Sequence, residues 1–183
     1  MNDNYEIKLP DGFDHQAFLS IDSTNKEAIR KLEDGAKTGL WITASEQTLG
    51  RGRSGRDWVS KPGNLYCSLI HKVGGDIQKS AQLTFVSSLA VRETISEFIA
   101  DDHIKCKWPN DILVDGRKIC GILIESSARS ATTLEYVIVG IGSVDPGEIL
   151  QRQREALGNR RLAVERRPNR LERGDHFLLV QFL

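Results

Sequence analysis

The chain is poor in cysteine and has neither a long apolar run nor a secretory start. Its three cysteines, Cys67, Cys106 and Cys120, form no CxxC pair, which argues against a disulfide framework or zinc site and favours reduced packing residues. No apolar run reaches the ~18 residues needed to cross a bilayer. The first residues, MNDNYEIK, lack the basic and apolar segments of a signal peptide. The sequence therefore predicts a cytoplasmic protein without a membrane partner.

An excess of one charge is also absent, because 25 basic side chains balance 25 acidic ones. This balance argues against a protein that binds DNA or RNA with its whole surface, so any function that needs positive charge must be local.

Lysine is missing from residues 143–183, which hold eight arginines, whereas residues 1–142 hold ten lysines and seven arginines. The composition therefore predicts one globular domain, 1–142, followed by an arginine-rich tail, 143–183.

Alternating apolar residues predict the strands of a sheet. The strand over 104–108 is expected to bury Ile104, Cys106 and Trp108 on one face. A hairpin is expected around Asp115–Gly116, a pair that suits a type I′ turn. The remaining strands are expected at 17–21, 40–45, 64–72 and 136–142.

Two helices are expected between these strands. The first begins at Thr24, because Thr24 and Glu27 have the spacing of a capping box. The second runs from about residue 78 to 100, with apolar residues that include Val86 and Ala90 over about half of its circumference. The order of elements predicts an α+β fold, a mixed β-sheet with the helices packed on one face.

A long loop over 46–64 carries glycines, a proline and three arginines. Gly50, Gly52 and Gly55 satisfy the dinucleotide-binding pattern GxGxxG, but Pro62 follows where that pattern needs a helix, so this interpretation is rejected. Arginines interleaved with glycines favour an anionic ligand, because guanidinium groups and backbone amides can both reach it. A solvated arginine loop and a local nucleic-acid patch remain as alternatives.

Five segments together resemble the biotin protein ligase family, in that family's order. They are DSTN (22–25), EQTLGRGRSGRDW (46–58), KWPNDILV (107–114), KICGILIE (118–125) and VIVGIG (137–142). The resemblance covers roughly residues 13–142, and it implies a class II synthetase-like catalytic domain that is incomplete at its C-terminus. No winged-helix segment precedes DSTN, so the chain resembles the monofunctional members.

The resemblance also implies an activity and its partners. The family joins biotin to ATP, with Mg²⁺, to give biotinyl-5′-AMP, and passes biotin to a lysine of a biotin carboxyl carrier protein domain in a biotin-dependent carboxylase. It implies no DNA partner, and a homodimer stays open. A catalytically impaired remnant that binds biotin weakly, or a lipoate or octanoate transferase, are the alternatives.

The resemblance assigns roles to individual residues. It implies Lys118 and Arg53 as catalytic residues. It implies a biotin site of Ser23, Thr24, Asn25, Gln47, Gly50, Arg51, Gly52, Arg53 and Lys118. It implies a nucleotide site of Arg51, Arg53, Arg56, Trp58, Asn110, Asp111 and Lys118.

Each of these residues also has a structural interpretation that the sequence leaves open. Ser23 and Thr24 can simply cap a helix, and Trp58 can be an interior side chain beside the sheet. Asp111 follows a proline in a turn, where it can be a turn former or can hold the Mg²⁺ of ATP, directly or through water. The resemblance stops at Ser143, and a shifted reading frame would produce the tail that follows.

Overall fold

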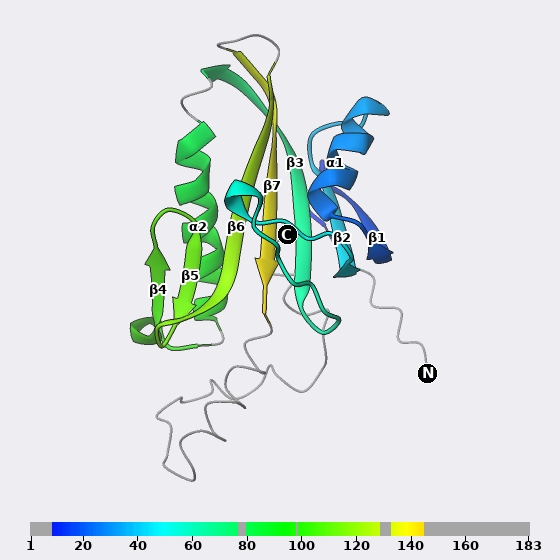
Figure 1. The fold of residues 1–183 in the computed structure, drawn as a ribbon. Coiled ribbons are helices and arrows are strands. Elements are labelled where there is room, and N and C mark those ends of the chain that lie inside the picture. The colour runs from blue at the N-terminus through cyan, green and yellow to red at the C-terminus, as the bar shows by residue number, and fades with distance from the viewer. Residues whose placement is uncertain (1–8, 77–79, 98, 129–132, 145–183) are drawn as a thin grey trace.

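The computed structural model describes residues 9–76, 80–97, 99–128 and 133–144, which form one mixed sheet and two helices (Figure 1). The helices are α1 (Thr24–Glu33) and α2 (Ser80–Ser96), and short 3-10 turns lie at η1 (Arg53–Gly55) and η3 (Asp101–His103). The strands are β1 (Asp14–Ile21), β2 (Leu40–Gln47), β3 (Leu65–Asp76), β4 (Ile104–Lys107), β5 (Asp111–Val114), β6 (Arg117–Ala128) and β7 (Thr133–Ser143). The predicted α+β class with a mixed sheet is confirmed.

The strand order β1-β2-β3-β7-β6-β5-β4 puts the last described strand, β7, in the middle of the sheet. β1 and β2 are parallel, and the other neighbouring strands are antiparallel. The register places Gly140 of β7 between Ser68 of β3 and Leu123 of β6. Residues that lie far apart in the sequence therefore become neighbours on one face of the sheet.

The two helices pack on opposite faces of the sheet, so the prediction that they share one face is wrong. α1 lies against Ile70 and Ile138, whereas α2 lies against a cluster that includes Val137 and Val139. Neighbouring residues of a strand point to opposite faces, so these clusters are two separate cores. Figure 1 shows α1 in front of the sheet and α2 behind it. The apolar stripe of a helix predicts that it packs, but not on which face.

The predicted capping box of α1 is also wrong, although the helix itself is confirmed. Ser23 is the N-cap residue, and its side chain makes no capping hydrogen bond. The Thr24 hydroxyl donates instead to Gln47 Oε1 at 3.1 Å, and the Glu27 carboxylate accepts from Arg30 Nε at 2.7 Å. The hydroxyl that the sequence assigned to the helix end is therefore part of a contact between α1 and β2.

Some residues predicted to be buried are exposed. Cys106 is exposed and Trp108 is 75% exposed, because β4 is a four-residue edge strand of which only Ile104 joins the core beside α2. On α2, Val86 is 60% exposed, whereas Val91 and Ile95 of the same predicted apolar face are buried in the core, and Leu83 packs against it. Ala90 is exposed as well.

The two remaining cysteines, Cys67 and Cys120, are buried as predicted for packing residues, and burial raises the pKa of the Cys67 thiol to about 12. No helix in the described ranges is long and apolar enough to cross a membrane. β7 runs to Ser143, and the predicted tail lies outside the described residues from position 145 onward.

The hairpin predicted at Asp115–Gly116 is confirmed, and it joins β5 to β6. Both residues have positive φ, 49° and 75°, as a type I′ turn requires.

His103 of η3, which lies outside the hairpin, forms two hydrogen bonds with this turn. Its Nδ1 lies 2.5 Å from Asp115 Oδ1, and its carbonyl accepts from the Asp115 backbone N–H at 3.1 Å. The hydrogen bond to Asp115 raises the pKa of His103.

Replacing His103 with asparagine is expected to lower stability more at acidic than at alkaline pH. A group whose pKa is raised by folding contributes stability that is fully present below its unfolded pKa, about 6.5, and is lost as pH rises through the folded value. Urea unfolding of both proteins at about pH 5.5 and about pH 9 measures the difference, with exposed His71→Asn as the control. An equal loss at both pH values for His103→Asn would contradict the prediction.

Candidate active site

On the face of the sheet that carries α1, three glycines form a patch without side chains, called the glycine floor below. Gly140 and Gly142 alternate along β7, and Gly121 of β6 is the register partner of Gly142, so the three glycines share one face. A Cβ at Gly140 would lie 2.1 Å from Asn25 Oδ1, and one at Gly142 would lie 2.7 Å from Trp58 Nε1. Glycine is needed here because α1 and the loop after β2 approach the backbone of the sheet closely.

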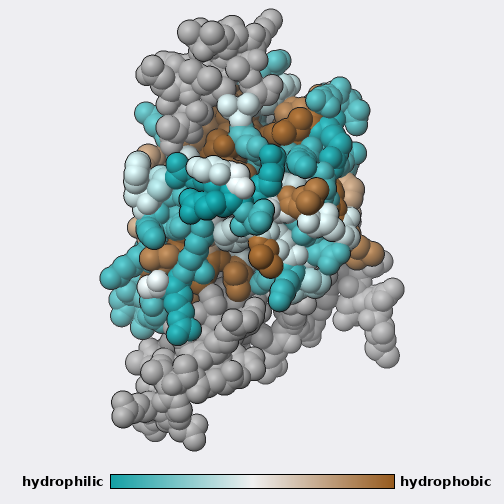
Figure 2. Space-filling view, in the orientation of Figure 1, coloured by the Kyte–Doolittle hydropathy of each residue, from teal (hydrophilic) through white to brown (hydrophobic). Residues whose placement is uncertain are grey.

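A cavity of about 240 Å³ lies over this floor. Hydrophilic side chains gather on this side of the molecule, where the loop after β2 crosses the sheet (Figure 2). The structure brings together around the cavity these predicted site residues: Ser23, Thr24, Asn25, Gln47, Arg51, Gly52, Arg53, Arg56, Trp58, Asn110, Asp111 and Lys118. The remaining one, Gly50, lies outside the lining, where a Cβ would be 2.4 Å from the Trp58 carbonyl oxygen.

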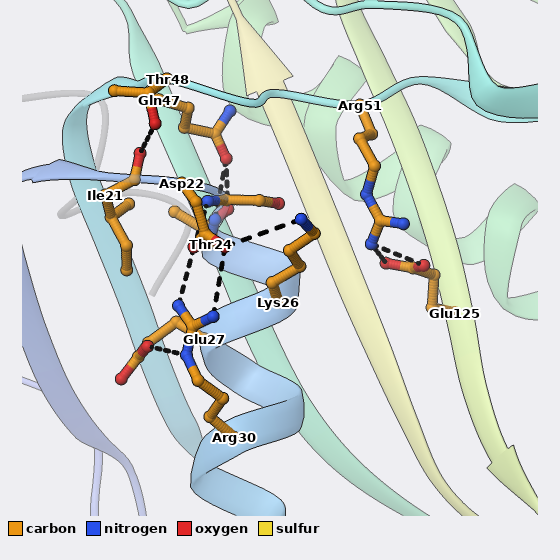
Figure 3. A network of polar contacts seen from close by, with 11 residues as sticks. Ile21, Asp22, Thr24, Lys26, Glu27, Arg30, Gln47, Thr48, Arg51 and Glu125 are labelled. Atoms are coloured by element: carbon orange, nitrogen blue, oxygen red, sulfur yellow. Dashed lines mark hydrogen bonds and ion pairs between the residues drawn. The ribbon is translucent and has the colours of Figure 1, made fainter.

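The buried end of the cavity is a chain of hydrogen bonds between α1, β2 and β3. The backbone N–H and the hydroxyl of Thr24 both donate to Gln47 Oε1, at 2.8 and 3.1 Å (Figure 3). The Ser68 hydroxyl lies 2.8 Å from Thr24 Oγ1 and donates to Asn25 Oδ1 at 2.6 Å. Thr24, Asn25 and Ser68 are each no more than 4% exposed. These polar groups are therefore fixed before a ligand arrives.

The loop after β2 folds back on itself above the cavity. The Gly52 N–H donates to the Arg56 carbonyl at 2.7 Å, and the Trp58 N–H donates to the Gly50 carbonyl at 2.9 Å. These two bonds close a narrow turn around η1, and the three arginines of the loop line the cavity. The glycines therefore shape a compact cationic loop and not the opening of a nucleotide-binding helix.

The three arginines of the loop have different partners. Arg51 Nη2 lies 3.1 Å from Glu125 Oε1, an ion pair that reaches from the loop to β6 (Figure 3). Arg53 donates to Asn110 Oδ1 at 3.3 Å, and Arg56 donates to the Arg53 carbonyl at 3.3 Å. Because the last two bonds go to neutral oxygens, these bonds do not compensate the positive charge of either guanidinium group.

Lys118 lies at the start of β6, directly after the hairpin turn, and is held on two sides. Its Nζ is 2.7 Å from Asp111 Oδ1 and 4.9 Å from the centre of the Trp58 ring. The Trp58 ring in turn lies over Gly121 and Gly142, so a cation and an aromatic face meet above the glycine floor. Trp58 is therefore part of the cavity wall, partly exposed, and not an interior side chain.

The carboxylates around the cavity suit a magnesium ion only when phosphate or water oxygens complete its coordination. Asp57 and Asp111 are the carboxylates that line the cavity, and Mg²⁺ usually takes one or two carboxylates together with substrate phosphates and water. Within the described ranges, no group of three or more His, Cys, Asp or Glu side chains could hold a metal ion. Asp111, within the cavity and 19% exposed, suits a metal that arrives with a nucleotide.

Several residues of the site had no predicted role. These are Ser68, Gly121, Glu125, Gly140 and Gly142. The sequence does contain a signal for the glycine floor, because glycines at alternate positions of an apolar strand, as in VIVGIG, indicate a place where another segment approaches the backbone closely. Ser68 and Glu125 could not be found in this way, because their contacts depend on how β3, β6 and β7 are ordered.

The fold and the cavity define an α+β domain in which a buried polar pocket adjoins a group of cationic side chains. Residues 17–143 match the biotin/lipoate A/B protein ligase family, and the chain belongs to that family. The resemblance found in the sequence is confirmed.

Individual relatives and structures agree with this assignment. The chain is 43% identical over 122 residues to a biotin--[acetyl-CoA-carboxylase] ligase of Paracoccus denitrificans, and this aligned region covers 66% of this chain and 50% of the relative. It is 42% identical over 123 residues to the bifunctional ligase/repressor BirA of Bacillus spizizenii, which covers 67% and 37% respectively. The chain thus spans half or less of the length of these curated relatives.

Among solved structures, the biotin protein ligase from Leishmania major in complex with biotinyl-5-AMP matches with a TM-score of 0.61 and 30% identity, over 74% of this chain and 57% of that one. The biotin protein ligase from Aquifex aeolicus in complex with biotin and ATP matches with a TM-score of 0.59 and 29% identity, over 92% and 66%. Both comparisons support the observed arrangement of the sheet and its helices.

Proposed function

We propose that this chain activates biotin with ATP to biotinyl-5′-AMP and then transfers biotin to a lysine of a biotin carboxyl carrier protein domain. The observation that carries the proposal is one cavity with a buried polar end, a cationic loop and a lysine on a strand. The relatives named biotin--[acetyl-CoA-carboxylase] ligase, and the structures with biotin, ATP and biotinyl-5-AMP, supply the chemistry that such a cavity suits.

The buried end of the cavity suits the ureido ring of biotin. That ring presents two N–H donors and one carbonyl acceptor, so it needs small polar groups in fixed positions. Ser23, which makes no capping bond, lines the cavity beside Thr24 and Asn25, and Gln47 closes the same end. Because Thr24, Asn25 and Gln47 are already ordered by hydrogen bonds to one another and to Ser68, binding would cost these three little side-chain entropy.

The other end of the cavity suits the reacting anions. In the first step a biotin carboxylate oxygen attacks the α-phosphorus of ATP, and the bond to the departing pyrophosphate breaks. Two unit charges 4 Å apart repel by about 1 kcal/mol in water and about 4 kcal/mol at an effective dielectric constant of about 20. Four cationic side chains and two carboxylates line the cavity, so its lining carries the excess positive charge that this step requires: Arg51, Arg53, Arg56, Lys118, Asp57 and Asp111.

In the second step the ε-amine of the carrier lysine attacks the acyl carbon of the adenylate, and AMP leaves. The adenylate is a mixed anhydride that water also cleaves, so the site must cover it. The cationic loop and Trp58 lie over the glycine floor in the position to do so. Asp111 would hold the Mg²⁺ of ATP, directly or through water, and the ion would neutralise phosphate charge.

Pyrophosphate release by the full 183-residue chain tests the proposal directly. With biotin, ATP and Mg²⁺ present, the chain is expected to release pyrophosphate, and addition of a carrier domain is expected to produce a biotinylated lysine that streptavidin detects. Lipoate and octanoate in place of biotin are the matched substrate controls.

Each alternative predicts a different result in the same assays. Turnover with lipoate or octanoate and not with biotin would assign the chain to the other branch of its family. Biotin binding by calorimetry without pyrophosphate release would identify an impaired remnant, and the absence of both would refute the proposal. A cytoplasmic location and the carrier as partner in place of DNA remain predictions that accompany it, and a homodimer stays open.

A further inference from the structure

Glu125 is a carboxylate outside the predicted site, yet it contacts two of the proposed ligand-binding residues. On β6 it is the register partner of Ile138, and it therefore faces the same side of the sheet as the glycine floor. Its Oε2 accepts from Asn25 Nδ2 at 2.7 Å, and its Oε1 lies 3.1 Å from Arg51 Nη2. Glu125 thus joins α1 to the cationic loop; its contact with Arg51 is drawn in Figure 3.

The contact with Asn25 decides which way the Asn25 amide points. An ionised carboxylate only accepts hydrogen bonds, so the NH₂ group must face Glu125 and the amide oxygen must face Ser68. Ser68 cannot make this choice, because a hydroxyl can donate or accept. The second acceptor near Asn25 Nδ2, the Leu123 carbonyl, lies 3.4 Å away and is the weaker partner.

The orientation passes along the chain of hydrogen bonds to the far side of the pocket. With the Asn25 oxygen facing Ser68, the single hydroxyl proton of Ser68 goes to Asn25, and that of Thr24 goes to Gln47 Oε1. At the opposite end, the Thr24 backbone N–H fixes Gln47 Oε1 as an acceptor. Glu125 and the Thr24 N–H therefore determine together where the pocket presents donors and acceptors.

The contact with Arg51 holds the guanidinium over the same pocket. The Arg51 side chain is 38% exposed and comes from a loop, so without a partner it would sample many rotamers. Two oxygens of Glu125 lie within 3.4 Å of Arg51 Nη2 and restrict it to the mouth of the cavity. A guanidinium that is already in place loses less entropy when it meets an anionic ligand.

We infer that Glu125 is a positioning residue that sets the donor and acceptor pattern of the biotin pocket through Asn25 and orients Arg51 at its mouth. The inference rests on the proposed function for the identity of the ligand. The contacts with Asn25 and Arg51 exist without a ligand, so the positioning itself can be tested separately.

Glu125→Gln is the informative variant because it keeps the shape of the side chain and removes its acceptor-only character. Glutamine offers one acceptor to two donors, so its NH₂ must face either Asn25 or Arg51. One of the two contacts is then lost, or the Asn25 amide turns over and inverts the donor and acceptor pattern of the pocket. We expect the biotin dissociation constant to rise at least about tenfold and the KM for ATP to change less than about threefold. The matched control is Glu135→Gln, because Glu135 and Glu125 both line a second cavity.

Double-mutant cycles separate positioning from a general loss of structure. If Glu125 acts through Asn25, the double variant Glu125→Gln/Asn25→Ala binds biotin no more weakly than Asn25→Ala alone. The same cycle with Arg51→Ala, on an exposed loop residue, serves where Asn25→Ala does not fold. Urea unfolding of the same variants without ligand gives the coupling in the empty protein.

The outcomes distinguish this inference from the proposed function. Tenfold weaker binding by Glu125→Gln, with non-additive cycles and an unchanged control, supports the inference. Biotin binding that is equal in Glu125→Gln and the unaltered chain overturns it and leaves the proposed function standing. If the unaltered chain binds no biotin, the proposed function fails, and coupling in the unfolding cycles then supports the positioning while additive effects overturn it.

Discussion

Replacing Lys118 with alanine is expected to lower the rate of biotinyl-adenylate formation at least about a hundredfold, because one donor that stabilises developing charge is commonly worth about 3 kcal/mol. Lys118 Nζ lies 2.7 Å from Asp111 and over the Trp58 ring, and Lys118 lines the cavity. Its strand begins at a tight hairpin, which places the ammonium group more accurately than a loop would. Biotin-dependent pyrophosphate release under saturating ATP measures the effect.

Two further variants show whether the loss is specific to the ammonium group. Lys105→Ala removes an exposed lysine from β4 in the same sheet and should leave the rate within about twofold. Lys118→Arg keeps the charge but replaces a compact donor with a planar fork, so it should recover only part of the rate. Pyrophosphate release by Lys118→Ala at the rate of the unaltered chain would remove Lys118 from the reaction.

The Asp115–Gly116 hairpin could be predicted because its cause is local. Two adjacent residues that tolerate positive φ, between apolar runs, specify a type I′ turn with little help from the rest of the chain. The strand over 40–47 and the helix that begins at Thr24 were predictable for the same reason, since each has its own apolar pattern. The residues gathered at the cavity, by contrast, came from resemblance and not from any periodicity.

The properties that depend on strand order could not be predicted from the sequence. β7 pairs with both β3 and β6, and only this order places Ser68 and Glu125 on either side of Asn25. α1 and α2 also lie on opposite faces of the sheet, a choice that the apolar stripe of neither helix encodes by itself. The spacing of Thr24 and Glu27 predicted a capping box, but the Thr24 hydroxyl donates to Gln47 instead. This tertiary partner lies 23 residues away and cannot be found from local spacing.

A methyl group on the glycine floor is expected to abolish tight biotin binding when it is placed at Gly140. The added Cβ would lie 2.1 Å from Asn25 Oδ1, and Asn25 is held on a helix and 4% exposed, so it cannot move aside without breaking its bonds to Ser68 and Glu125. Two buried hydrogen bonds lost together are worth about 3 kcal/mol, so the dissociation constant for biotin should rise roughly a hundredfold. Calorimetry with Gly140→Ala measures it.

Gly142→Ala, two residues further along the same face, is the matched control with a different expected defect. Its Cβ would lie 2.7 Å from Trp58 Nε1, and Trp58 belongs to a partly exposed loop that can shift. Biotin binding alone should then change less than about fivefold, while the KM for ATP should rise, because the displaced ring is the proposed nucleotide contact. If Gly142→Ala weakened biotin binding as strongly as Gly140→Ala, the polar end and the nucleotide end of the cavity would not be the separate sites inferred from the glycine floor.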